Sequence, residues 1–274
     1  MIITFLKKYL IFLFLIFLLQ SCSNKQKTKT NYNPDGKILN IEYYDDNGFL
    51  KTKKNFSENG DLISIFEFKK GEKIKMMFYD GNRLVSDLFL EKKDIWNQRI
   101  YYDNITIYGN GKIDNQGRQI GWWSFFDNNK ILKQKQEFMN IDNNQYLNQA
   151  IIFEKNGKID FKNSFFISLN IKKIKDKIYR CKLNYNNQKS KISEAAICIG
   201  NDIKEDFSNV SSVHLDTVNI INKSFPIEFE NTGEKIIRGF LLSRYTKNPN
   251  ETSINEKTVF LESKIYFEYK ILVE

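Results

Sequence analysis

Turn glycines recur at a short and nearly constant spacing through the first third of the chain. Gly36, Gly48, Gly60, Gly71 and Gly81 are separated by 12, 12, 11 and 10 residues, and polar residues flank each of them. Asn-Gly and Asp-Gly pairs are a strong hairpin signal because they tolerate positive φ. Strand-length segments lie between the glycines, at 38–44, 50–56, 62–68, 73–79 and 83–90. The spacing predicts a β-meander in which a hairpin joins each strand to the next.

Similar units return later in the chain, at 101–138 and at 150–163. The clearest copies read Tyr-Tyr-Asp-Asp-Asn-Gly at 43–48 and Gly-Trp-Trp-Ser-Phe-Phe-Asp-Asn-Asn-Lys at 121–130. Over residues 33–140 the chain resembles the MORN-variant repeats of YwqK-type antitoxin components. The resemblance implies a sheet of stacked hairpins, because one hairpin is too small to bury its own apolar face.

The repeat pattern weakens in one place and changes in one turn. Units between 84 and 108 match the pattern less well, so the number of repeats stays open. Asn129 stands where the resemblance places a turn glycine. We expect Asn129 to replace that glycine, because Asn tolerates the left-handed backbone conformation.

Aromatic side chains are the main candidates for a binding surface. Trp122 and Trp123 are adjacent, so alternation along a strand sends one inward and the other outward. The exposed ring, with Tyr43, Tyr101 or Phe125 nearby, would form a platform for a carbohydrate or a peptide. The alternative is that these aromatics are mostly core. Both interpretations stay open from the sequence.

The chain changes character after residues 141–148, which are predicted to be a polar connector. Strand-like runs then become longer and less regular, and no amphipathic helix interrupts them. Seven to nine such runs over 149–274 predict an antiparallel β-sandwich of immunoglobulin-like architecture. The predicted fold class is therefore all-β, with a MORN-variant-like β-hairpin repeat domain at 33–140 followed by the sandwich.

The first residues have the pattern of an export signal. Lys7 and Lys8 precede an apolar run, Tyr9–Leu19, whose 11 residues are too few to span a bilayer, which needs about 20. The run ends in Leu-Gln-Ser-Cys at 19–22, which resembles the lipobox of bacterial lipoproteins. The resemblance implies a lipoprotein signal peptide at 1–21 and a lipid-modified Cys22. The alternatives are a secreted protein cut near Ser21, or an uncleaved anchor.

A lipidated Cys22 would hold the mature protein on a membrane. The diacylglyceryl group and a third acyl chain, such as palmitate, bury enough methylenes for stable anchoring. Residues 22–32 are polar and lysine-rich and are predicted to be a lipidated tether. Ser23 and the lack of an acidic tract after it favour the outer membrane, with the protein facing the periplasm. No cofactor other than this covalent lipid is predicted.

Two further cysteines lie in the predicted sandwich. A hairpin centred between Lys189 and Ser190 would place Cys181 opposite Cys198, so an oxidising compartment would allow a disulfide. The alternative is two buried free thiols. A metal site is not predicted, because a structural zinc ion takes four ligands and His214 is the one histidine of the chain. We expect a structural role for His214.

Several function classes are disfavoured by the sequence. It contains no nucleophile elbow, phosphate loop or His-Glu-x-x-His motif, so no catalytic residue is predicted. The formal net charge is +9, yet no basic run is interleaved with stacking aromatics, which argues against nucleic acid as a partner. We therefore predict a non-enzymatic envelope lipoprotein that binds or scaffolds an unidentified envelope protein. The alternatives are a glycan-binding accessory lipoprotein and, by family resemblance, an antitoxin-like or immunity protein.

Overall fold

The computed structural model describes residues 27–141, 143–187, 192–200, 202–219, 224–246 and 260–274. Every strand pairing in these ranges is antiparallel, which confirms the all-β prediction. Within the same ranges, no helix is long and apolar enough to cross a membrane. The predicted signal peptide and Cys22 lie outside the described residues.

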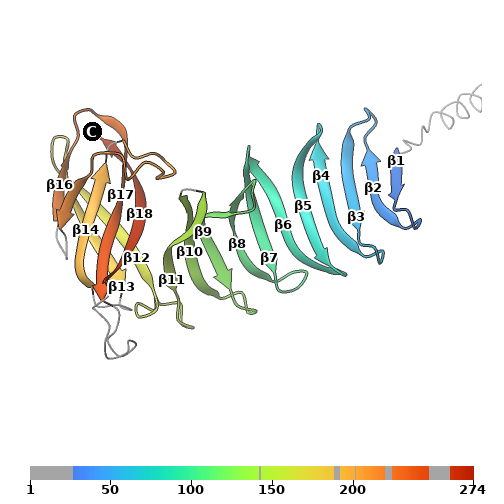
Figure 1. Cartoon of the computed structure of the whole chain (residues 1–274), viewed down its shortest axis with the longest axis horizontal. Helices are drawn as coiled ribbons and strands as arrows, with labels where there is room; N and C mark the ends of the chain where they lie inside the picture. Colours follow the sequence, from blue (N-terminus) through green and yellow to red (C-terminus); the bar gives the residue numbers. More distant parts are fainter. Residues whose placement is uncertain (1–26, 142, 188–191, 201, 220–223, 247–259) are drawn as a thin grey trace, which may run out of the picture. The chain divides into compact units, whose positions relative to one another are not determined.

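The chain divides into two compact units, one ending at Leu84 and the other beginning at Val85. In the first unit, five strands follow one another in sequence order, each paired with the next (Figure 1). These strands are β1 (Thr28–Tyr32), β2 (Ile38–Tyr44), β3 (Leu50–Phe56), β4 (Leu62–Lys69) and β5 (Glu72–Asp80). The predicted hairpin meander is confirmed here, nearly to the residue.

The tether prediction was wrong at its C-terminal end. Residues 28–32 form strand β1, in which Thr30 pairs with Ile41. The Asn31 side chain donates a 2.6 Å hydrogen bond from Nδ2 to Oδ1 of Asn40. A polar strand of this kind suits a sheet edge, where few apolar side chains are needed, so polarity alone did not distinguish it from a linker.

Three of the five periodic turns, those closed by Gly36, Gly48 and Gly60, share one hydrogen-bond pattern. At the turn that begins with Asp45, the Asp45 N–H donates to the carbonyl of Phe49 (2.9 Å), and the Gly48 N–H donates to the Asp45 carbonyl (3.0 Å). The Asp45 carboxylate also accepts from the N–H groups of Asn47 (3.0 Å) and Phe49 (2.8 Å). Gly48 closes the turn with a φ of 83°, a conformation that glycine adopts without a Cβ penalty. Turns that begin at Asn33 and Ser57 have the same backbone bonds.

The second unit opens with a further meander. This meander includes the stretch between 84 and 108, where the repeat motif is weak in the sequence. Its strands are β6 (Arg83–Lys92), β7 (Ile95–Tyr101), β8 (Ile107–Asp114), β9 (Gln119–Phe126), β10 (Leu132–Ile141) and β11 (Asn144–Ile152). Each pairs with its sequence neighbour. Hairpin units therefore continue through that stretch although the repeat motif does not.

Two local predictions in this meander were wrong. Residues 141–148 are not a connector, because Ile141 pairs with Asn144 across a tight turn and the following residues belong to β11. The polar residues there serve a hairpin turn, in which Asn143 has a φ of 63°. In the turn that begins at Asp127, Lys130 rather than Asn129 takes the glycine position, with a φ of 64°.

The remaining strands form the predicted β-sandwich. They are β12 (Phe165–Lys175), β13 (Ile178–Asn187), β14 (Ile192–Gly200), β15 (Asp216–Asn219), β16 (Ser224–Glu228), β17 (Gly233–Thr246) and β18 (Phe260–Val273). Strands β12, β13 and β16 continue the meander sheet after β11, whereas β15, β14, β17 and β18 form a second sheet in that order. Figure 1 shows β14, β17 and β18 side by side in this second sheet. Between the two sheets lies an apolar core that includes Ile197, Leu241 and Phe225.

The cysteine hairpin was wrongly predicted. Strands β13 and β14 belong to different sheets, so Cys181 pairs with Ile171 and Phe225, whereas Cys198 pairs with Thr217 and Phe240. Both cysteines are buried free thiols, which is the alternative that the sequence left open. Strands β13 and β14 do not form the predicted hairpin with each other, because placing them in different sheets lets both bury an apolar face in the core between the sheets.

Candidate functional site

The two adjacent tryptophans of β9 face opposite sides of the sheet, as alternation predicts. The Trp123 side chain is fully buried, with an exposed fraction of 0%, and that of Phe125 is 7%. The indole Nε1 of Trp123 donates to the Lys112 carbonyl at 2.9 Å, and its ring lies directly over Gly111. Trp122 remains 42% exposed. Trp123 and Phe125 are therefore core residues, and only Trp122 of β9 is available as a binding surface.

A shallow groove of about 350 Å³ lies beside Trp122 on strands β6 to β9. Its lining combines aromatic rings, carboxamides and cations: Phe89, Asn97, Gln98, Arg99, Asn110, Gly111, Lys112, Trp122 and Ser124. The strand register explains this grouping. Phe89 pairs with Asn97, which pairs with Lys112, and Arg99 pairs with Asn110, which pairs with Ser124. Two cross-strand rows thus bring their side chains to one face.

An ion pair fixes the cationic side of the groove. The Arg99 guanidinium bonds Asp87 through two nitrogens, Nε to Oδ1 at 2.9 Å and Nη2 to Oδ2 at 2.5 Å. It also lies 4.6 Å from the ring centroid of Phe89. Asp87 is buried, and its hydrogen bond raises the pKa of Arg99 further. Bidentate pairing holds a guanidinium more rigidly than a single contact does.

Tyr101 contacts both members of the Asp87–Arg99 ion pair, and the Arg99 guanidinium lies over its ring. Its hydroxyl donates to Asp87 Oδ2 at 3.1 Å. Burial, followed by the charge of Asp87, raises the pKa of Tyr101 to about 12. The phenol therefore stays protonated at neutral pH and acts as a donor that orients Asp87. It supports the groove and is not an exposed platform.

Lys112 is the second cation in the groove lining, and it forms an ion pair with Glu91. Its Nζ contacts Glu91 Oε1 at 2.7 Å, and this hydrogen bond is the largest of the causes that lower the pKa of Glu91. The carboxamides between the two cations supply both donors and acceptors. Chemically, the groove can stack a flat apolar face on Trp122 and hydrogen-bond the polar edge of the same ligand.

The other predicted site residues lie elsewhere. Tyr43 belongs to β2 of the first unit and does not line this groove; Lys54 Nζ lies 5.6 Å from its ring centroid. His214 is 93% exposed, with Nε2 at 3.7 Å from Asp216 Oδ1. Among the described residues, no three His, Cys, Asp or Glu side chains are grouped so that they could hold a metal ion. Burial raises the pKa of Cys181 to about 11, so its thiol is un-ionised at neutral pH.

Sequence reasoning missed most of the groove. Asp87, Arg99, Asn97 and Asn110 lie in the stretch where the repeat motif is weak. The one available signal was an Asp and an Arg at outward positions of successive strand-length segments. The register that pairs Asp87 with Arg99 is not visible without the fold.

Comparison with known proteins adds little. No family model matches the chain. No curated protein matches it either. A solved structure described as a porin-like protein from Bacteroides uniformis aligns with 88% of this chain and 95% of that chain, at 11% identity and a TM-score of 0.13. A TM-score this low carries no argument about fold or function.

Proposed function

We propose that this protein is a membrane-anchored lipoprotein of the cell envelope that acts as a non-enzymatic binding module. The groove beside Trp122 is the observation that carries the proposal. It combines an exposed tryptophan, a rigidly held arginine and several carboxamides on one face. These groups can bind and orient a ligand, and the lining residues that the structure describes include no pair of carboxylates for acid–base chemistry.

A protein is the first candidate ligand. Trp and Arg are the side chains that most often dominate the binding energy of protein interfaces. Here Trp122 and Arg99 lie in the same groove, and Arg99 is held by Asp87, so little side-chain entropy is lost when a partner binds.

Site-specific photocrosslinking in intact envelopes tests this candidate. A photoreactive residue at Asn110 in the groove should yield a discrete crosslinked protein that disappears when Trp122→Ala is added. The same residue at Asn156, in an exposed turn of the same unit, is the matched control and should not yield that product. Equal crosslinking from both positions, or a product that is indifferent to Trp122→Ala, would contradict a protein-binding groove.

A glycan is the second candidate, favoured by the carboxamides. Asn97 and Asn110 offer paired donors and acceptors to sugar hydroxyls beside a ring that can stack on a sugar face. Calorimetric titration with soluble envelope glycan fragments should then show saturable binding that Trp122→Ala abolishes and Phe49→Ala, at an exposed aromatic of the first unit, leaves unchanged. Heat that is insensitive to Trp122→Ala would remove this candidate.

The anchoring part of the proposal rests on the lipobox-like residues before Cys22. Mass spectrometry of the mature N-terminus should find an acylated Cys22, and a Cys22→Ala form should leave the membrane fraction. An unmodified Cys22 in a protein that remains soluble after export would overturn the localisation without affecting the groove.

A further inference from the structure

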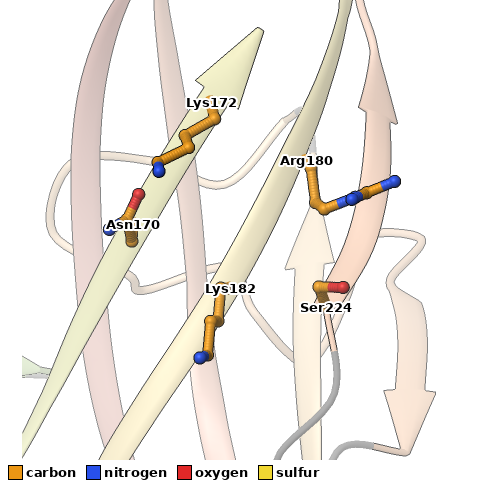
Figure 2. A pocket seen from close by; sticks show the side chains of 5 residues that line it. All are labelled: Asn170, Lys172, Arg180, Lys182 and Ser224. Atoms are coloured by element: carbon orange, nitrogen blue, oxygen red, sulfur yellow. The ribbon is translucent and has the colours of Figure 1, made fainter. Parts of the chain in front are cut away.

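We propose that the outer face of the sandwich, on strands β12, β13 and β16, carries a second site that binds a phosphate group. The site is a hollow of about 490 Å³ lined by Asn170, Lys172, Arg180, Lys182 and Ser224. Figure 2 shows the five side chains on these three neighbouring strands, with the Arg180 guanidinium extended toward β16. Its residues are separate from those of the Trp122 groove.

Strand register places these residues together. Lys172 pairs directly with Arg180, and Lys182 lies between Asn170 on one side and Ser224 on the other. All five side chains are exposed, while the alternating residues of the same strands, Ile171, Cys181 and Phe225 among them, point into the sandwich core. A rigid two-layer scaffold therefore presents the cluster.

Arg180 is the exceptional arginine of this protein. The other five arginines each form an ion pair with a carboxylate: Arg83 with Asp80, Arg99 with Asp87, Arg118 with Asp114, Arg238 with Glu268 and Arg244 with Glu262. Among the described residues, Arg180 has no carboxylate within ion-pair distance, and neither do Lys172 and Lys182. The chain pairs its arginines consistently, so an unpaired guanidinium in a hollow indicates that its anion comes from outside.

The register also places like charges side by side. Residues directly opposite each other in an antiparallel pair have Cβ atoms about 5 Å apart, and like charges there are destabilising. Lys172 and Arg180 occupy such a pair, and Lys182, two residues from Arg180 on β13, is the diagonal neighbour of Lys172. The acid on the same face, Glu228, is opposite Ile178 and forms no ion pair with the cluster within the described residues. A bound anion would offset this repulsion.

The chemistry of the lining selects the ligand. Arginine presents a planar fork that matches two phosphate oxygens, lysines add point charges, and the Asn170 amide and Ser224 hydroxyl are neutral donors. Among the described residues, no aromatic ring or large apolar side chain lines the hollow, so the phosphate itself is the recognised group. The volume exceeds that of a lone phosphate ion, which suits a phosphate monoester attached to a larger molecule.

Two sources can supply such a monoester: a soluble phosphorylated sugar and the headgroup of a membrane lipid. The test uses the full mature chain carrying Cys22→Ala, so that vesicle binding does not report the acyl anchor. Amide NMR shifts are followed against inorganic phosphate, glucose 6-phosphate and glucose at constant ionic strength. Sedimentation is measured with phosphatidylcholine vesicles containing or lacking 20 mol% phosphatidic acid, an amount on the order of the anionic lipid content of many membranes.

Arg180→Gln is the principal variant, and Lys158→Gln, at an exposed lysine in a turn of the same unit, is the charge-matched control. We expect phosphate to shift amides of β12, β13 and β16, and Arg180→Gln to weaken binding by about tenfold or more, as the loss of charge-assisted hydrogen bonds implies. Lys158→Gln should leave the affinity unchanged. Arg180 is exposed, so the variant should keep the native far-ultraviolet circular dichroism spectrum; if it does not, the double variant Lys172→Gln/Lys182→Gln takes its place.

The outcomes distinguish a soluble phosphorylated sugar from a lipid headgroup, and both from the absence of a phosphate site. Binding of glucose 6-phosphate but not glucose supports a soluble ligand, and sedimentation only with phosphatidic acid supports a headgroup. Either result supports the site when Arg180→Gln weakens the binding by about tenfold or more. No shift with any phosphate, or equal weakening by Arg180→Gln and Lys158→Gln, would overturn the proposal. Neither result bears on the Trp122 groove, which these variants leave intact.

Discussion

At the scale of single residues, backbone conformation and burial decide what individual side chains can do. Lys130 occupies the closing position of its turn, with a φ of 64°. Glycine takes this position in the other turns that have the same backbone hydrogen bonds. A residue with a Cβ pays roughly 1 kcal/mol or more for the left-handed region. Lys130 therefore stores strain that the surrounding hydrogen bonds outweigh.

The change Lys130→Gly should raise the free energy of unfolding by about 0.5–1 kcal/mol, because relief of the strain exceeds the added entropy of the unfolded chain. Urea unfolding measures this effect. Gly157→Lys, at the same position of another turn in this unit (φ 81°), is the converse control and should destabilise the protein. Destabilisation by Lys130→Gly would show that the side chain has a role that outweighs its backbone.

The two sandwich thiols should be inert in the folded protein. Cys181 and Cys198 are both buried and so shielded from reagents, and burial raises the pKa of Cys181 to about 11, so almost none of the Cys181 thiol is ionised at pH 8. In a Cys22→Ala chain, a disulfide-exchange reagent should label neither cysteine until denaturant is added, and then label both. A Ser168→Cys variant, exposed on β12, supplies the positive control. Rapid labelling of the native thiols would contradict the buried placement.

At the scale of elements, a close approach between strands shapes the site. Gly111 on β8 lies directly under the ring of Trp123 on β9, and a Cβ at this glycine would overlap the ring. The flat contact lets Trp123 donate to the Lys112 carbonyl, and it leaves Trp122 on the outer face beside the groove. The absence of a Cβ at Gly111 therefore allows the positions of both tryptophans.

Gly111→Ala should lower the free energy of unfolding by about 1–3 kcal/mol, the usual cost of overpacking a well-packed site. Thermal unfolding followed by tryptophan fluorescence measures the loss. Asn110→Ala changes the adjacent, outward-facing residue and serves as the control, for which only a small effect is expected. An unchanged melting temperature in Gly111→Ala would mean that Trp123 repacks without cost.

These elements also show how far local patterns reach. Strand bounds between residues 38 and 90 were predictable because turn residues and two-residue alternation act within a few positions. The groove was not predictable, because it depends on the register that pairs Asp87 with Arg99 across two strands of weak motif. Polar segments were misjudged at 28–32 and at 141–148, since edge strands and tight turns have linker-like composition.

At the largest scale, the second unit joins its meander to its sandwich through buried amides. Asn148 of β11 is fully buried; its Nδ2 donates to the Tyr266 carbonyl and its Oδ1 accepts from the Tyr266 N–H, both at 2.8 Å. One side chain thus pairs with strand β18 as a peptide group would. Gln149 Oε1 accepts from the Ile167 N–H at 2.8 Å, which ties β11 to β12.

Glu137 is the ionisable group of this junction. Its carboxylate accepts from Asn148 Nδ2 (2.5 Å) and Gln149 Nε2 (2.7 Å), yet burial outweighs these bonds and raises the pKa of Glu137 above its ordinary 4.5. For an acid with a raised folded pKa, ionisation costs stability. The cost is complete above the folded pKa and disappears as the pH falls through it toward 4.5.

Glu137→Gln keeps the acceptor oxygen and removes the charge, so it should stabilise the protein most at neutral pH. Each unit by which burial raises the pKa corresponds to about 1.4 kcal/mol. Urea unfolding between pH 7 and 4.5 should show the difference between variant and parent shrinking as the pH falls. Glu154→Gln, at an exposed turn position of the same unit, should give a flat difference. A difference that grows toward acid would reverse the sign of the argument.

The sequence by itself determined that this chain is all-β and where its glycine-marked hairpins turn, because these properties are encoded in neighbouring residues. The export signal with a lipobox-like end, inferred from equally local residues, stays a prediction. Only the tertiary structure decided which sheet each sandwich strand joins, and with it the fate of Cys181 and Cys198. It also decided that five arginines meet carboxylates while Arg180 faces a hollow. The physical reason is that strand partners are chosen by burial of whole apolar faces, across distances along the chain that no local pattern records.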